Sequence, residues 1–82
     1  MTLNEMKVSQ KAIIKMVNGK GALRHRLLEM GLVPNTIIKL QKMAPLGDPL
    51  EIMIRGYELT LRISEAMLIE VEVINNENCI NR

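Results

Sequence analysis

Two short runs of alternating apolar and polar residues, close together in the sequence, constrain the fold of this chain most. Residues 50–55 alternate in this way, and residues 58–63 repeat the pattern. A period of two places every second side chain on one face of a strand. Because only Gly56 and Tyr57 separate the two runs, they predict a β-hairpin.

Three further segments are typical of strands. Residues 11–17 (KAIIKMV) are short and rich in β-branched side chains, and Asn18-Gly19 follows them as a turn signal. Residues 36–43 form the next strand that we expect, and residues 68–74 form the last one. The chain therefore contains five predicted strands.

Residues 22–30 follow a helical period instead. Leu23, Leu27 and Met30 recur at the spacing of one helix face, and Gly31 follows where a left-handed residue ends a helix. Ser64 predicts the N-cap of a single helical turn just before the last strand. The sequence thus predicts one helix of about two turns and one isolated turn.

Strands this short, with turns this frequent, indicate a small closed or partly closed barrel. We expect Leu3 and Met6 to anchor a turn that covers an open end of its core. The chain has 82 residues, which suffices for one domain. We expect that domain to span residues 1–74, followed by a flexible tail over residues 75–82.

The composition excludes several classes of function. The chain has no Trp or Phe, and Tyr57 is its single aromatic residue, so the core must be aliphatic. Surfaces that bind bases or proline-rich peptides depend on aromatic side chains, which this chain cannot supply. The net charge of +2 is also too small to indicate nucleic-acid binding.

Cysteine and hydropathy patterns bear on the compartment. Cys79 is the single cysteine, so no disulfide can form within the chain, and a reducing compartment is the better interpretation. The N-terminus does not resemble a signal peptide, and no apolar stretch approaches the length of a membrane span. We therefore expect a cytoplasmic protein that does not insert into a membrane.

Few residues suit catalysis or metal binding. His25 is the single histidine, and it lies four residues before Glu29, which predicts a solvated pair on one helix face. The same two donors, with Cys79 as a third, leave open weak binding of a transition metal. Because no converging set of acid, base and nucleophile is present, we expect no enzyme.

The loop Leu46-Gly47-Asp48-Pro49 is the strongest candidate for a binding surface. One interpretation is a hairpin cover in which Asp48 hydrogen-bonds its own backbone. Another is a docking loop, because a stiff loop with an apolar tip suits binding on a rigid barrel. Arg55 and Tyr57 would then form part of the rim, and these interpretations do not exclude each other.

Taken in order, the segments resemble the FeoA family of ferrous-iron transport proteins. Three motifs carry the resemblance: residues 21–34 (GALRHRLLEMGLVP), residues 44–52 (APLGDPLEI) and residues 55–62 (RGYELTLR), followed by Glu65-Ala66. The resemblance extends from about Leu3 to Val73. It implies an SH3-like barrel whose helix is inserted between the first two strands.

The resemblance also implies a function. It indicates a non-enzymatic cytosolic accessory of FeoB, the bacterial membrane transporter for ferrous iron, held at the inner membrane through that partner. Similar domains close iron-dependent repressors, which leaves direct binding of ferrous iron or a metal-linked regulatory role as the alternative. The partner-binding residues that we predict are Leu46, Asp48, Arg55 and Tyr57, with Arg24, Arg26 and Glu29 as a second face.

Overall fold

The computed structural model describes residues 1–74, and its order of elements follows the sequence prediction. The elements are η1 (Leu3–Glu5), β1 (Lys11–Val17), α1 (Gly21–Glu29), β2 (Ile37–Met43), β3 (Leu50–Ile54), β4 (Tyr57–Leu61), α2 (Ile63–Ala66) and β5 (Ile69–Ile74). The five predicted strands, the helix between the first two of them and the turn before the last are confirmed. The predicted tail and Cys79 lie outside the described residues.

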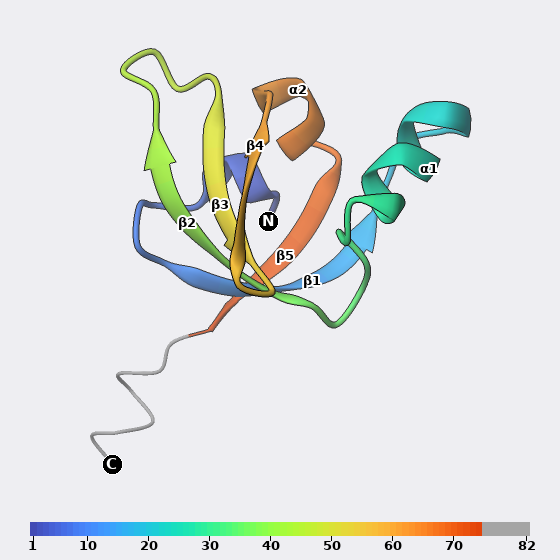
Figure 1. The fold of residues 1–82 in the computed structure, drawn as a ribbon, viewed down its shortest axis with the longest axis horizontal. Coiled ribbons are helices and arrows are strands. Elements are labelled where there is room, and N and C mark those ends of the chain that lie inside the picture. Colours follow the sequence, from blue (N-terminus) through green and yellow to red (C-terminus); the bar gives the residue numbers. More distant parts are fainter. Residues whose placement is uncertain (75–82) are drawn as a thin grey trace.

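One antiparallel sheet, in the order β4-β3-β2-β1-β5, bends around a single core (Figure 1). The two end strands, β4 and β5, do not pair with each other, so the barrel is partly open. The helix α1 projects to one side of the barrel, and α2 lies over one end. None of the helices in residues 1–74 is long and apolar enough to cross a membrane.

The core is aliphatic, as the composition predicts. The inward residues of β3, Leu50, Ile52 and Ile54, are all fully buried, and this confirms the alternation expected for that strand. Leu3 and Met6 are 0% and 3% exposed, so the anchoring role predicted for them is confirmed. Each fully buried side chain of this size contributes about 1.5–3 kcal/mol relative to an exposed one.

The helix α1 buries only part of its apolar face against the barrel. It starts at Gly21 and ends at Glu29, one residue earlier at each end than the sequence predicts. Leu27 is fully buried, but Leu23 on the same face is 38% exposed, so the predicted apolar face is only partly used. Gly31 has a φ of +100°, which confirms the left-handed residue expected after the helix.

The end of β4 differs from the sequence prediction. The strand β4 ends at Leu61, and Ile63 belongs to α2 rather than to the strand. Arg62 is the N-cap of α2, so the prediction that Ser64 caps this turn is wrong. The helix begins earlier because the backbone N–H groups of Arg62 and Ile63 find acceptors in Glu65 and Asp48.

Candidate functional site

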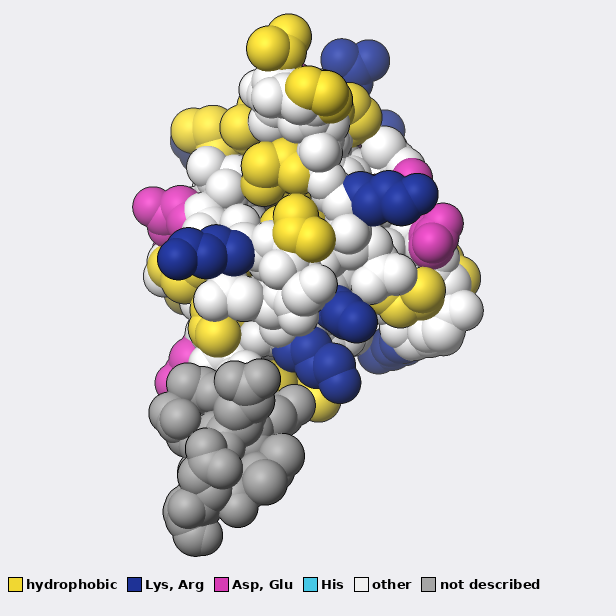
Figure 2. Space-filling model, turned by 90° about the vertical axis from the view of Figure 1, so that its left-hand side faces the viewer, with side chains coloured by type: hydrophobic (Ala, Val, Ile, Leu, Met, Phe, Trp, Pro, Cys, Tyr) yellow, Lys and Arg dark blue, Asp and Glu magenta, His cyan; other side chains and the backbone are white. Residues whose placement is uncertain are grey.

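The loop between β2 and β3 carries the most exposed of the large apolar side chains in residues 1–74. Leu46 is 94% exposed at the tip of residues 44–49. Two backbone hydrogen bonds fix the loop, from the N–H of Gly47 to the carbonyl of Ala44 and from the N–H of Ala44 to that of Pro49. In Figure 2, hydrophobic side chains gather at the top of the molecule, where this loop lies, with Lys or Arg side chains beside them. Leu46 is therefore presented to solvent by a rigid turn.

Asp48 has a different local role from the one predicted. Its Oδ1 accepts a hydrogen bond from the backbone N–H of Ile63 at 2.9 Å. The prediction that it bonds its own backbone is therefore wrong, since its partner lies fifteen residues further along the chain. Asp48 links the tip of the β2–β3 hairpin to the first turn of α2, which holds the Leu46 loop in place.

Arg55 and Tyr57 lie at the other end of β3. Four residue steps along a strand span about 13 Å, so these side chains and Leu46 do not form one compact patch. Arg55 has a φ of +50°, and its Nη2 lies 3.4 Å from the hydroxyl of Thr36. Tyr57 is 44% exposed, and its hydroxyl donates to the carbonyl oxygen of Met30. The first predicted face is therefore divided between two ends of the barrel.

The second predicted face lies on α1, and its two arginines hold the helix. The Nε of Arg24 donates to the carbonyl oxygen of Val17 in β1 at 3.1 Å. Arg26 forms an ion pair with Glu65 of α2. Glu29 faces solvent beside His25. The three side chains thus point to three different neighbours rather than to a common face.

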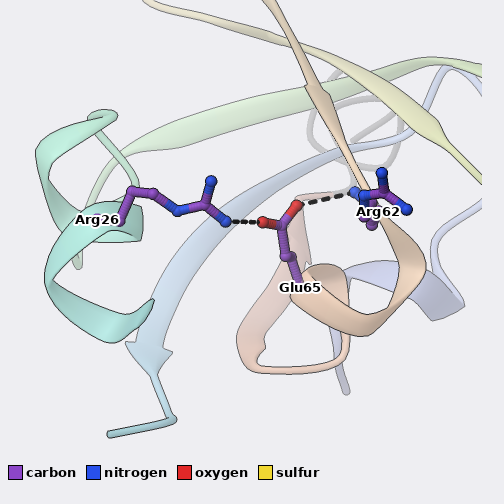
Figure 3. A network of polar contacts seen from close by, with 3 residues as sticks. All are labelled: Arg26, Arg62 and Glu65. Carbon is purple, nitrogen blue, oxygen red and sulfur yellow. Dashed lines mark hydrogen bonds and ion pairs between the residues drawn. The ribbon is translucent and has the colours of Figure 1, made fainter. Parts of the chain in front are cut away.

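Arg26, Glu65 and Arg62 form a network that the sequence did not indicate (Figure 3). One carboxylate oxygen of Glu65 accepts from Arg26, and the other accepts from the backbone N–H of Arg62 at 3.0 Å. The guanidinium of Arg62 points away from Glu65. The three residues border a hollow of about 530 Å³ together with Asp48, Pro49 and Thr60. Because Arg26 lies 39 residues before Glu65, no local pattern reveals their ion pair.

A second, more apolar hollow adjoins the first, since both are lined by Pro49 and Thr60. It has a volume of about 230 Å³ and lies over β2 and β3. Glu51 lines this hollow, and its Oε1 is buried without a hydrogen-bond partner in the described part of the chain. The hollow is large enough for water to solvate this oxygen.

The pair of His25 and Glu29 is the sole candidate for metal binding among the predicted residues. Their Nε2 and Oε2 atoms lie 3.0 Å apart, and both side chains are about two-thirds exposed or more. Within residues 1–74 no three His, Cys, Asp or Glu side chains come together in a way that could hold a metal ion. The pair therefore supplies two donors at an exposed position.

The geometry defines a class: a small, partly open β-barrel domain with an exposed apolar loop at one end. The family model of the FeoA domain matches residues 1–73. The chain therefore belongs to the FeoA family, which is involved in ferrous iron transport and is not a known family of enzymes. The resemblance drawn from the three sequence motifs is confirmed.

Related proteins agree with this assignment. The chain is 41% identical over 76 residues to the Fe(2+) transport protein A/Fe(2+) transporter FeoB fusion protein of Porphyromonas gingivalis, covering 93% of this chain. The matched stretch amounts to only 9% of the fusion protein's length. The solution structure of the FeoA-like protein from Clostridium acetobutylicum is 37% identical, with a TM-score of 0.84, and covers 92% of this chain and 87% of the other.

A crystal structure confirms the fold class predicted from the sequence. FeoA of Stenotrophomonas maltophilia, complexed with zinc and described as an SH3 domain protein, has a TM-score of 0.78 to this chain. The two are 30% identical, and the match covers 88% of this chain and 89% of that one. The SH3-like barrel is therefore the fold of this chain.

Proposed function

We propose that this chain is a non-enzymatic accessory of ferrous iron uptake that docks on the cytosolic region of FeoB. The observation that carries the proposal is the fusion relative, in which a stretch similar to this chain and an FeoB transporter share one polypeptide. Two proteins that are joined in one organism are good candidates for a complex where they are separate. The fusion supports FeoB as the partner, and it does not indicate which face of this chain docks.

The Leu46 loop is the docking face that the geometry favours. Leu46 is almost fully exposed, yet the loop around it is held by backbone bonds and by Asp48. A rigid apolar side chain loses little conformational entropy when a partner covers it. Residues of this kind, at the centre of an interface, carry much of the binding energy.

Co-purification with FeoB in mild detergent tests this proposal. We expect Leu46→Asp to abolish capture, because the substitution would place a carboxylate in an apolar contact. Val8→Asp is the matched control, since Val8 is also an exposed apolar loop residue, at 51%, and lies between η1 and β1. Equal capture of the wild type, Leu46→Asp and Val8→Asp would reject the Leu46 face, and no capture of the wild type would reject the partner.

His25 and Glu29 support a second candidate function, weak binding of ferrous iron. Imidazole and carboxylate are ligands that suit iron, and the two atoms lie on the same face of α1. Two exposed protein donors would leave most coordination positions to water. We therefore propose, as the alternative, a low-affinity site that would act on cargo iron rather than hold a resident metal.

A further inference from the structure

The two edges of the sheet are protected differently. At the β5 edge, Thr2 bridges to Glu70, and the backbone N–H of Val71 donates to the carbonyl of Met1 at 2.8 Å. The start of the chain therefore covers this edge. At the other edge, β4 pairs with β3 alone, and within the described residues no isolated bridge or further backbone hydrogen bond reaches it (Figure 1).

The turn between β3 and β4 indicates which backbone groups point outward at the unpaired edge of β4. Arg55 and Gly56 have φ values of +50° and +85°, which fit a two-residue turn of the primed type. Such a turn makes Ile54 and Tyr57 a hydrogen-bonded pair. Hydrogen-bonded and non-hydrogen-bonded pairs then alternate along the ladder, so that Glu58 and Thr60 fall in the non-hydrogen-bonded pairs. The N–H and C=O groups of Glu58 and Thr60 therefore point away from β3.

These outward groups have no protein partner in residues 1–74. The backbone hydrogen bonds outside the ladders include none from Glu58 or Thr60, and both residues are exposed. The edge is also regular: five consecutive pairs join β3 to β4, whereas the β1–β5 and β2–β3 ladders each contain a register shift. Natural proteins protect an edge strand with Pro, a bulge or charged side chains, especially Lys. Tyr57–Leu61 contains no Pro, Lys or bulge, and Glu58 is its single charged residue.

The charge next to this edge indicates what chemistry would suit it. Arg62 follows β4 directly, and its guanidinium takes part in no ion pair among the described residues. The neighbouring carboxylates already have donors: Asp48 accepts from the N–H of Ile63, and Glu65 accepts from Arg26 and from the N–H of Arg62. The five donors of Arg62 therefore remain available beside the hollow, where they suit an incoming carboxylate.

We propose that an extended segment of the cytosolic region of FeoB adds as a strand to the β4 edge and places an acidic side chain against Arg62. This proposal rests on the proposed function and names how the partner is held. The backbone groups of Glu58 and Thr60 supply main-chain hydrogen bonds, which give affinity in this mode of recognition. Arg62 supplies the preference for an acidic residue.

A second copy of the chain is a less suitable occupant. Antiparallel self-pairing centred on Leu59 would join two strands of only five residues each. A contact confined to this edge falls short of the roughly 1,000 Å² that a stable protein interface buries, whereas the proposed contact with FeoB also includes the Leu46 loop. Pairing between two copies is nevertheless a possible outcome of the test, and it would overturn the proposal.

Two substitutions of Thr60 distinguish the contribution of the backbone N–H at this edge from that of the side chain. Proline at an outward-facing edge position removes the free N–H and leaves the bonds to β3 intact. We expect Thr60→Pro to weaken binding of the cytosolic region of FeoB by about tenfold or more, and Thr60→Ala to change it less than about twofold. We also expect Arg62→Gln to weaken binding several-fold and to reduce its salt dependence. Equal binding by Thr60→Pro and Thr60→Ala would reject the added strand.

Hydrogen exchange of the wild-type chain gives a readout that does not depend on whether the Thr60 and Arg62 variants fold. The amides of Glu58 and Thr60 should exchange rapidly in the free chain and become protected when the cytosolic region of FeoB is added. Binding without protection of these two amides overturns the strand addition and leaves the proposed function intact. Protection that depends on the concentration of this chain alone indicates a second copy and also overturns the proposal. Absence of binding by the wild type rejects both.

Discussion

The hydroxyl of Tyr57 donates a hydrogen bond to the carbonyl oxygen of Met30 at 2.5 Å, so the start of β4 is joined to the C-terminal end of α1. Carbonyl groups in the last turn of a helix lack partners within the helix. Tyr57 supplies one of these partners from a distant strand. Together with the bonds of Arg24 and Arg26, this bond helps to fix the orientation of the helix, in which Leu27 is the one fully buried side chain.

Tyr57→Phe should therefore reduce stability without changing the fold. The ring is retained, but the carbonyl of Met30 loses its donor, which costs about 0.5–1.5 kcal/mol. Urea denaturation of the two proteins measures this difference. If Tyr57→Phe is as stable as the wild type, water replaces the hydroxyl fully and the bond does not hold α1.

Gly31→Ala should cost more than the same change at Gly56. Both glycines have a φ that alanine rarely adopts, +100° and +85°. A Cβ at Gly31 would lie 3.2 Å from the hydroxyl of Tyr57, whereas one at Gly56 would meet nothing within 4 Å. We expect both variants to lose about 1–2 kcal/mol to backbone strain, with a further loss at Gly31 as Tyr57 is displaced. Thermal unfolding of both variants tests this order, and an equal loss would contradict it.

Asp48→Ala should destabilise the chain through α2. The substitution removes the acceptor for the N–H of Ile63, and loss of a helix cap of this kind costs about 1 kcal/mol. Asp48→Asn keeps an oxygen at the same position and serves as the control, with a smaller expected effect. Chemical denaturation measures both. A fully stable Asp48→Ala variant would show that this bond does not position the loop.

Ser9→Gly should stabilise the chain. Ser9 has a φ of +80°, where a side chain is unfavourable by about 1–2 kcal/mol, and its N–H donates to the carbonyl of Leu40 at 2.7 Å. Glycine relieves this strain but has more freedom when unfolded, so we expect a net gain of about 0.5–1 kcal/mol. Val8→Gly, beside it and without a positive φ, should give no gain. Thermal unfolding decides between these outcomes, and a loss at Ser9→Gly would refute the argument.

The iron alternative gives a separate prediction. In an anaerobic titration with ferrous iron, a site at His25 and Glu29 should broaden the NMR signals near His25, because the ion is paramagnetic. His25→Gln should lose this broadening, and Arg24→Gln, one residue away, should keep it. An unchanged spectrum, or broadening confined to other residues, would remove this candidate.

Much of the fold could be predicted from local patterns. The alternation in residues 50–55 gave the buried face of β3, and Gly31 marked the end of α1, because both signals depend on neighbouring residues only. Ser64 was a plausible cap by the same reasoning. It failed because α2 starts earlier, where Glu65 accepts from the N–H of Arg62 and Asp48, fifteen residues before Ile63, accepts from the N–H of Ile63. The acceptor that a distant loop supplies leaves no local pattern.

The candidate site was less predictable for the same reason. Leu46 was identified by its position between turn residues, which is a local property. The predicted strand over residues 50–55 already implies that Tyr57 lies at the opposite end of β3 from Leu46, which the grouping of these residues into one face did not take into account. The network of Arg26, Arg62 and Glu65 joins α1 to α2, and it depends on how the chain closes around the core.

The most direct test of docking on FeoB is a chemical-shift map of this chain, labelled with ¹⁵N, as the cytosolic region of FeoB is added. We predict saturable shifts that include Leu46 and Gly47, and their loss in Leu46→Asp but not in Val8→Asp. A spectrum of the wild-type chain that does not change at any concentration of the partner would contradict the proposed function.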